Sequence, residues 1–518
     1  MALVVRFYQL GIVPFSLDWD EVSNSYNAYS ILKTGRDEYG NFLPVTNRSF
    51  DDYKPPLYMY LDIPAVAIFG LNNISARLPS AILGLLSVFL VYYLTKLLFK
   101  NEKLSLLSAA IFAIEPWSSH FSRIGFEANI GLFCTLGTFT FLLLAFNENI
   151  LMKKRKLFLL LSSIFFVLSM YSYHSTRIFV PLLSLTTLFI YKNQVLSLGK
   201  RYIFLLILIT FVFLLPIIIF APKGSFANRL EETTQKAILH DLNTSTNLIQ
   251  EDNSQQQKFS TIIHNRRIVI IQSAIQRYMS HFDVNFLFTN GDDNFRHHIE
   301  QHGLLFLFQL PLFLIGLYIA VKKHTQNHLF ILSWLILAPI PASLGDAFPH
   351  AIRSYNLIFP ITVLSAIGLI SIMSTLHFKN IKSSAITISI IGTLPFIVYT
   401  HNYLNHYNVD EGVWWQFGYK EAVLQTENLK SRFDKILIDP SMEQGYIFWL
   451  YYSKYDPSQY QRSNDKNHFD KYFFTNSKST GPKELYVSLV KSFPSNFVVL
   501  KTINDPKGQP IIKIGYEN

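Results

Sequence analysis

The sequence predicts an all-α polytopic membrane protein with about 11 transmembrane helices and a small C-terminal α/β domain. One observation behind this prediction is composition: half of the 518 residues are hydrophobic and only 15% are charged, whereas soluble domains carry about 25% charged residues. The other is that apolar blocks, many near the roughly 20 residues needed to cross a bilayer, recur until about residue 400. The predicted spans are residues 1–15, 80–99, 104–116, 128–146, 157–170, 177–191, 202–222, 303–321, 328–343, 355–374 and 385–400.

The charges of the short loops predict which side each loop faces. We expect one further apolar block, 56–71, to lie at the membrane interface, because it is short and contains Asp62 and Pro64. The opposite short loops then carry only Arg123, Arg177 and Arg353. By the positive-inside rule these three face outward. The single cysteine and the lack of an organelle signal lead us to expect a multi-pass protein of a bacterial plasma membrane. The thirteen inward cations are Lys100, Lys103, Lys153, Lys154, Arg155, Lys156, Lys192, Lys200, Arg201, Lys322, Lys323, Lys379 and Lys382.

Two domains are expected from the change in composition along the chain. Residues 1–400 form the predicted membrane domain, with large outer loops at about 16–79 and 223–302. Residues 401–518 are more polar and rich in Tyr, and form a predicted extracytoplasmic α/β domain. There "KILIDP" and "NFVVLKTI" read as buried strands, and "GYKEAVLQTENLKSRF" reads as a helix. We expect the polar segment from His240 to Ser260 to be a mobile loop tip.

Several classes of function are disfavoured. The net charge of +10 is spread over loops, and no basic patch interleaved with aromatic residues predicts a nucleic-acid partner. The single cysteine, Cys134, rules out a disulfide within the chain and a cysteine zinc site. No HExxH or similar signature predicts a metal, so we expect neither a metal nor another cofactor.

The unusual polar residues collect in the predicted outer loops. "DWDE" places Asp18, Asp20 and Glu21 in the first outer loop, and "YKPP" follows with Lys54. Each residue alone has a plainer reading: an Arg can anchor in lipid headgroups, a His can bond at a helix end, and Asp18 can cap a helix. Together they predict a site for an anionic, lipid-linked ligand at the outer face. The outer His and Arg residues at helix ends are Arg123, His174, Arg177, His350 and Arg353.

One kind of chemistry would use both the acidic cluster and the outer His and Arg residues. If a sugar is linked through phosphate to a long isoprenoid, the phosphate leaves without a proton, since its second pKa is near 6. Cations then stabilise the developing charge. An acceptor hydroxyl is a poor nucleophile and requires a general base. We therefore expect the acidic loop to supply the base and the later loops to bind the phosphate.

At these residues the chain resembles glycosyltransferase family 39, in the GT-C fold class. The resemblance rests on "LDWDEVSNSYNAYSILKTGRDEYG", "DDYKPPLYMYLDIPAVAIFG", "RLPSA" and "HFSRIGFEAN" in this order. The family includes dolichyl-phosphate-mannose protein mannosyltransferases and aminoarabinose transferases of lipid A. It implies inversion in a single displacement, with Asp20 and Glu21 as the catalytic pair and Asp20 as base. It also implies binding of the donor phosphate by Lys54 and, at less closely matching positions, by Arg123, Arg177, His350 and Arg353. As a member of the same outer polar set, His174 is expected to bind the donor phosphate with them.

The resemblance leaves some questions open. The acceptor is a protein, a lipid or a glycan, and the sugar is not specified. Tyr53 precedes Lys54, where aminoarabinose transferases often have an acidic residue, which weighs against a metal site taken from those enzymes. A carrier or flippase is the first alternative, although carriers usually have repeated halves and charges near the midplane. A non-catalytic scaffold for lipid-linked sugars is the second.

Overall fold

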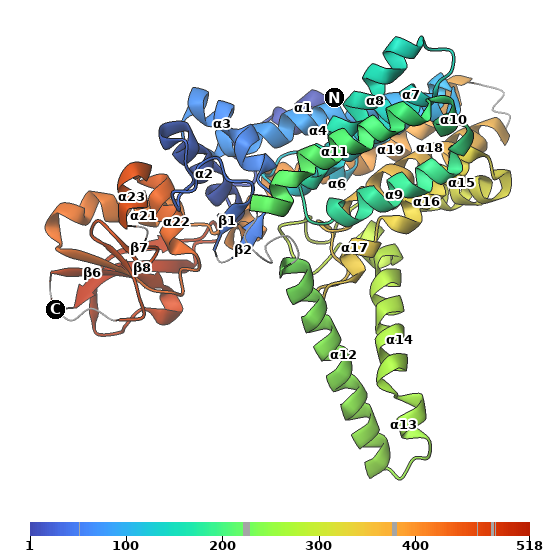
Figure 1. Cartoon of the computed structure of the whole chain (residues 1–518). Coiled ribbons are helices and arrows are strands. Elements are labelled where there is room, and N and C mark those ends of the chain that lie inside the picture. Colours follow the sequence, from blue (N-terminus) through green and yellow to red (C-terminus); the bar gives the residue numbers. More distant parts are fainter. Residues whose placement is uncertain are drawn as a thin grey trace. The chain divides into compact units, whose positions relative to one another are not determined.

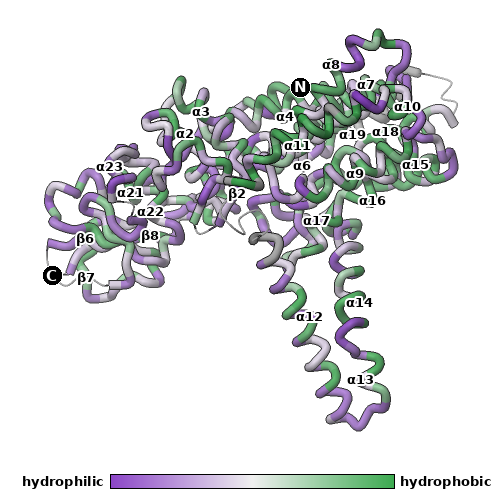
Figure 2. The backbone as a smooth tube through the Cα atoms, in the orientation of Figure 1, coloured by the Kyte–Doolittle hydropathy of each residue, from purple (hydrophilic) through white to green (hydrophobic). Residues whose placement is uncertain are grey.

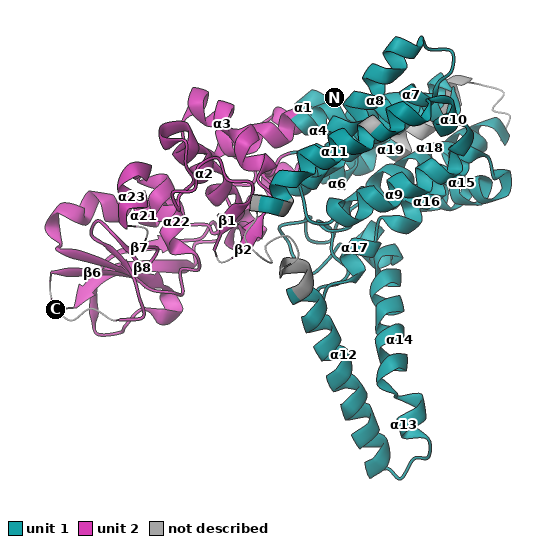
Figure 3. Cartoon of the chain, in the orientation of Figure 1, with its two compact units in different colours: residues 1–5, 83–122, 127–399 teal, residues 6–82, 123–126, 400–518 magenta. Residues whose placement is uncertain are grey.

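The computed structural model describes the chain except for residues 51, 221–227, 376–380, 464, 478–480, 482 and 518. The predicted inward cation Lys379 and the start of the predicted outer loop at 223 therefore lie outside the described residues. The chain is mostly helical (Figure 1) and divides into two compact units (Figure 3). Unit 1 comprises residues 1–5, 83–122 and 127–399; unit 2 comprises residues 6–82, 123–126 and 400–518.

Unit 1 is a bundle of apolar helices. Two of them, α15 and α18, pack closely because small residues face the neighbouring backbone: a Cβ atom on Gly316 would lie 1.9 Å from the Leu364 oxygen, and one on Gly368 2.0 Å from the Leu312 oxygen. The helices are α4 (Asn73–Phe99, shared with unit 2), α5 (Glu102–Ile114), α6 (Pro116–Phe121), α7 (Glu127–Phe146), α8 (Met152–Met170), α9 (Thr176–Ile190), α10 (Lys192–Ser197), α11 (Lys200–Phe220), α15 (Gln309–Lys323), α16 (Gln326–Leu337), α17 (Ile340–Ser343), α18 (Ile358–Thr375) and α19 (Ile381–Asn405, also shared with unit 2).

The predicted spans from 80–99 onward each contain a helix, and Figure 2 shows how apolar these helices are. Among the described residues, four segments are long and apolar enough to cross a membrane by length and composition. The predicted number of about 11 crossings remains a prediction. The four segments are Asn73–Phe99, Glu127–Phe146, Lys200–Ile217 and Tyr355–Thr375.

The first predicted span, 1–15, is wrong as a helix of that length. Only α1 (Ala2–Phe7) is helical there, and turns follow it. The chain carries Gly11 and Pro14 just beyond α1. Glycine is entropically costly in a helix, and proline lacks the N–H that a continuing helix would need. The buried Arg6 at the end of α1 is also a poor residue for a lipid-facing span.

A helical hairpin replaces the mobile tip expected in the second outer loop. Helix α12 (Asn228–Ser254) takes up most of the segment from His240 to Ser260, so that expectation is wrong. The short α13 (Ser260–Ile263) and α14 (Arg266–Met279) complete the hairpin, which projects from the rest of unit 1 (Figure 1). Apolar residues at helical spacing in a polar sequence carry the signal for this hairpin, which composition alone obscures.

Unit 2 contains the first outer loop and the C-terminal region. The loop forms α2 (Trp19–Thr34), the hairpin of β1 (Asn47–Ser49) and β2 (Asp52–Lys54), and α3 (Leu57–Phe69). The C-terminal region forms a mixed six-stranded sheet in the order β4-β5-β3-β6-β8-β7, as predicted for an α/β domain. Its elements are α20 (Tyr407–Asp410), α21 (Tyr419–Leu429), α22 (Gly445–Tyr452), α23 (Pro457–Ser463), β3 (Lys435–Ile438), β4 (His468–Phe469), β5 (Tyr472–Phe474), β6 (Glu484–Leu489), β7 (Phe497–Asn504) and β8 (Pro510–Glu517).

The predicted C-terminal elements are present, but one strand differs in burial. Strand β3 lies inside the sheet, parallel to both β5 and β6, and is mostly buried as predicted. Strand β7 is at the sheet edge and mostly exposed, so its predicted burial is wrong. In "FVV" only Phe497 is buried, whereas the exposed Val498 and Val499 supply β propensity rather than core volume.

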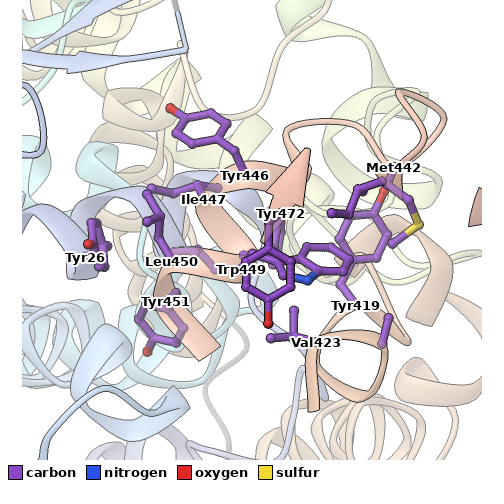
Figure 4. Packing of buried hydrophobic residues seen from close by; sticks show 14 of the residues in the cluster. Tyr26, Tyr419, Val423, Met442, Tyr446, Ile447, Trp449, Leu450, Tyr451 and Tyr472 are labelled. Atoms are coloured by element: carbon purple, nitrogen blue, oxygen red, sulfur yellow. The ribbon is translucent and has the colours of Figure 1, made fainter. Parts of the chain in front are cut away.

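The core of unit 2 joins the first outer loop to the C-terminal sheet. Tyr26 of α2 is buried with Leu450 and Tyr451 of α22, and Trp449 packs with Tyr472 of β5 (Figure 4). The Tyr26 hydroxyl donates a hydrogen bond to the Tyr455 carbonyl oxygen at 3.1 Å. The predicted division at residue 400 stays a prediction, whereas the packing gathers these two segments around one core.

Candidate active site

The acidic stretch that begins the first outer loop is the start of α2. Asp18 is the N-cap: its carboxylate accepts hydrogen bonds from the backbone N–H groups of Asp20 at 2.9 Å and Glu21 at 3.0 Å. The Glu21 carboxylate accepts from the Asp18 N–H at 3.1 Å, which completes a capping box. Asp18 is thus used to begin a helix, and the plainer reading of this residue is confirmed.

Glu21 is the buried partner of Arg77, which lies in the first turns of α4. Arg77 Nε donates to Glu21 Oε1 at 2.9 Å and Arg77 Nη2 donates to Oε2 at 3.1 Å. Both side chains have no exposed surface. The other guanidinium donors bond to the carbonyl oxygens of Pro14 and Ser16, each at 2.6 Å. A bidentate pair of this kind fixes the position of Glu21.

A third segment, residues 123–126, approaches the same carboxylate. The Gly125 N–H donates to Glu21 Oε1 at 2.7 Å. A Cβ atom at position 125 would come within 2.9 Å of the Glu21 side chain, so only glycine permits this approach without a shift. Two residues earlier, Arg123 donates to the Val13 carbonyl oxygen at 3.1 Å and lies over the Tyr403 ring. Glu21 therefore holds Arg77 and the segment carrying Arg123 close to α2.

Asp20 is the member of the acidic cluster that keeps an accessible carboxylate. Its side chain is 30% exposed and forms an ion pair with Lys54, which ends β2 and is 10% exposed. Pro55 and Pro56 follow Lys54, and their fixed φ angles restrict the chain where it turns into α3. The structure thus brings Asp20, Glu21 and Lys54 together in unit 2, with Arg123 on a segment that Glu21 contacts.

Two other predicted residues, His174 and Arg177, belong to unit 1 at the start of α9. Arg177 Nε donates to the Met170 carbonyl oxygen at 2.9 Å, and Arg177 Nη1 is 3.4 Å from His174 Nδ1. These contacts join the end of α8 to the start of α9. The two residues therefore stabilise a helix connection, which agrees with the plainer reading of His174 but is not the lipid anchoring suggested for an arginine. Any further part in ligand binding stays a prediction.

The predicted residues His350 and Arg353 lie in a second cluster of unit 1. Asp292 is its centre: its carboxylate accepts from His297 Nδ1 at 2.7 Å and from the Ala351 N–H at 2.8 Å. Although burial opposes it, the charge and hydrogen bond of His297 hold the pKa of Asp292 well below its usual range. Burial, together with the charge of Arg353, keeps the pKa of His350 well below its usual range.

Asp292, His297 and His350 are also the residues that could hold a metal among the described ones. One ligand atom from each lies within 4.8 Å of the others. The nearby positive charge of Arg353, and the hydrogen bond that already joins Asp292 to His297, make this set a poor fit for a cation. The expectation that no metal is required stays a prediction.

The main site residue that was not singled out from the sequence is Arg77. It lies within the quoted segment "RLPSA", just before an apolar block. An arginine at the edge of such a block is costly unless paired, and this was the available signal. Gly125 could not have been recognised without the fold, because its role depends on a contact 104 residues away in sequence.

Comparison with solved structures gives the class of fold. The chain is similar to ArnT from Cupriavidus metallidurans bound to undecaprenyl phosphate, with a TM-score of 0.57 and 13% identity, covering 99% of this chain and 96% of that chain. It is also similar to two structures of the Archaeoglobus fulgidus oligosaccharyltransferase. One holds Zn and sulfate (TM-score 0.52, 15% identity) and covers 87% of this chain and 60% of that chain. The other, AglB with an inhibitory peptide and a dolichol-phosphate (TM-score 0.50, 14% identity), covers 87% and 62%. The chain has the fold of the GT-C glycosyltransferases.

Within this class, residues 53–220 match the model of a family described as dolichyl-phosphate-mannose-protein mannosyltransferase. The resemblance predicted from the sequence is thereby confirmed. A curated relative, an uncharacterized protein of Aquifex aeolicus, is 32% identical over 124 residues. That match covers 24% of this chain and 28% of the relative, so the chain aligns with less than a third of the relative's length.

Proposed function

We propose that this chain is an integral-membrane, inverting glycosyltransferase that moves a sugar from a polyprenyl-phosphate donor to a hydroxyl acceptor on the outer face of the plasma membrane. The GT-C fold and the family match over residues 53–220 support the class of reaction. The acceptor is a protein, a lipid or a glycan. The single observation that carries the proposal is the pair formed by Asp20 and Lys54 beside the fully bonded Glu21.

Asp20 is the base in this proposal. Asp18 caps α2, Glu21 is bonded to Arg77 and Gly125, and both side chains are buried, so neither carboxylate is accessible to a substrate. The Asp20 side chain is 30% exposed, so its carboxylate is the one of the three that an acceptor hydroxyl can reach to give up its proton. Glu21 is then a positioning residue, because it orients the first turn of α2 on which Asp20 lies.

In the proposed reaction Lys54 exchanges its partner, from Asp20 to the phosphate of the donor. In the structure its ammonium group pairs with Asp20. The phosphate of a donor would compete for that ammonium, and binding would leave the Asp20 carboxylate available to the acceptor. The same ammonium would then stabilise the charge that develops on the leaving phosphate. Arg123 is the second phosphate-binding cation that we propose. His174, Arg177, His350 and Arg353 are proposed as further donor contacts.

The test is transfer activity with the full-length protein in detergent. Radiolabelled polyprenyl-phosphate sugars are offered one at a time with a membrane extract as acceptor. Asp20→Asn should reduce transfer at least a hundredfold, because a positioned general base contributes about 10²–10⁴-fold. Asp434→Asn makes the same chemical change at an exposed residue of the C-terminal region and should leave transfer unchanged.

The result also separates the alternatives. Transfer that persists in Asp20→Asn would show that Asp20 is not the base, although the protein would still be a glycosyltransferase. Donor binding without transfer in the wild type, for every sugar offered, would instead favour a carrier or a scaffold for lipid-linked sugars.

A further inference from the structure

The hairpin of α12 and α14 has an apolar face that the rest of unit 1 leaves exposed. Along α14 the exposed apolar residues are spaced by three or four, so they form one stripe. The stripe consists of Ile268, Ile271, Ile275 and Met279, which are 39%, 59%, 58% and 55% exposed. At the tip of the hairpin, Phe259, Ile262 and Ile263 are exposed as well. Together these seven residues are the hairpin apolar surface.

Hydrogen bonds join the two helices of the hairpin to each other and to the rest of unit 1. Near its base, Arg277 of α14 donates two hydrogen bonds of 3.0 Å to the Asp241 carboxylate of α12, and both side chains are buried. Farther out, the Ser245 hydroxyl bonds to the His264 carbonyl oxygen at 2.6 Å. The Tyr278 hydroxyl joins the base to the Ile336 carbonyl oxygen of α16 at 2.8 Å. The exposed stripe is therefore held in a fixed direction.

Two observations indicate what covers this surface. Figure 1 shows α12 and α14 running crosswise to the long apolar helices of unit 1, so a hairpin at the end of those helices extends along a bilayer that they cross. Exposed Lys258, Arg266 and Arg267 lie beside the tip. Cations next to an apolar stripe complement lipid phosphates above acyl chains, as in helices that lie in a membrane interface.

We propose that the hairpin apolar surface is a membrane-docking site that lies in the outer leaflet, with the tip cations on anionic lipid headgroups. This role is separate from catalysis, so it can fail while the proposed transferase activity stands. It would fix the hairpin to the bilayer surface on the side where a lipid-linked donor is presented.

The experiment uses the full chain in vesicles of phosphatidylcholine and phosphatidylglycerol. In a Cys134→Ala background, Ile271→Cys carries an environment-sensitive nitrobenzoxadiazole label, and Gln276→Cys, on the same helix outside the stripe, is the matched control. We expect a nitroxide on the lipid acyl chains to quench the label at 271 at least threefold more than at 276. Equal quenching of both labels by aqueous iodide, with none by the lipid nitroxide, would overturn the proposal.

A second measurement uses trypsin, whose sites at Lys258, Arg266 and Arg267 flank the tip. The double variant with Ile271→Asp and Ile275→Asp should be cleaved at these sites at least tenfold faster than the wild type in vesicles. Cleavage limited to the tip separates this effect from misfolding, which would expose sites throughout the chain. Equal cleavage rates would overturn the proposal. So would protection that depends on protein concentration and persists without lipid, because it would assign the surface to a second copy of the chain.

Discussion

Replacing Arg77 by methionine should destabilise the protein by about 3–5 kcal/mol, the usual cost of removing one partner of a buried ion pair. This loss of unfolding free energy is large for a single substitution, for reasons that the structure shows. Arg77 and Glu21 have no exposed surface, and the change removes both hydrogen bonds to the carboxylate. It also leaves the Pro14 and Ser16 carbonyl oxygens without their donor. Glu21 would keep only the N–H groups of Asp18 and Gly125.

The assay is denaturant unfolding of the purified protein in detergent micelles. A loss of about 3–5 kcal/mol lowers the folding equilibrium constant by roughly a hundredfold to a few thousandfold. Arg432→Met removes an exposed arginine and should change the free energy of unfolding by less than about 0.5 kcal/mol. Adding Glu21→Gln to Arg77→Met should restore part of the loss, since the unpaired buried charge is then removed. An Arg77→Met protein as stable as Arg432→Met would refute the assignment of a buried, coupled pair.

Three further outcomes are expected. Asp18→Ala should cost about 1–2 kcal/mol in the same unfolding assay through loss of the N-cap, and a cost no greater than that of Asp18→Asn would contradict this role. Burial raises the pKa of Glu38 to about 8, with the hydrogen bond from Asn27 only partly offsetting it. The unfolded chain releases this proton near pH 4.3, so stability should fall as pH rises from about 4.5 to 8. Glu38→Gln should remove that slope and stabilise the protein by on the order of 3 kcal/mol at pH 7; an unchanged slope would mean that Glu38 is ionised when folded. Lys54→Ala and Arg123→Ala should each weaken binding of a labelled donor about tenfold or more, while the acceptor KM changes less than twofold. Donor affinity equal to that of the wild type would refute the phosphate-binding assignment.

Local sequence patterns predicted most of the helices but not where the polar residues meet. The apolar blocks from 80–99 onward each contain a helix because length and hydropathy are properties of one segment. The prediction of a long helix over 1–15 was wrong because Gly11 and Pro14, which disfavour a helix, lie inside this apolar segment. The polar helix α12 was missed because the prediction there rested on composition, and the contacts that pair α12 with α14, such as Asp241 with Arg277, are not visible in a local segment.

For the candidate site too, local patterns predicted some features and the rest depended on long-range contacts. The proposed roles of Asp20, Glu21 and Lys54 came from short motifs and a family resemblance, which identify residue types at fixed spacing. The resemblance named Asp20 as the base, but sequence could not show that Glu21 is fully buried and bonded while the Asp20 side chain stays partly exposed. The distinction depends on Arg77 and Gly125, which reach Glu21 from 56 and 104 residues away. Long-range contacts of this kind are not encoded in any local pattern.

The shared core of unit 2 bears on how such proteins can be recombined. Helix α2, which carries Asp20, packs against α22, and Gln461 of α23 bonds to the Ser30 hydroxyl at 3.0 Å and the Asp37 carbonyl oxygen at 2.8 Å. A chimera that took its C-terminal region from a relative but kept its own first outer loop would place two unmatched surfaces in one core. A working chimera should therefore exchange the two segments together, although more than three hundred residues of chain separate them.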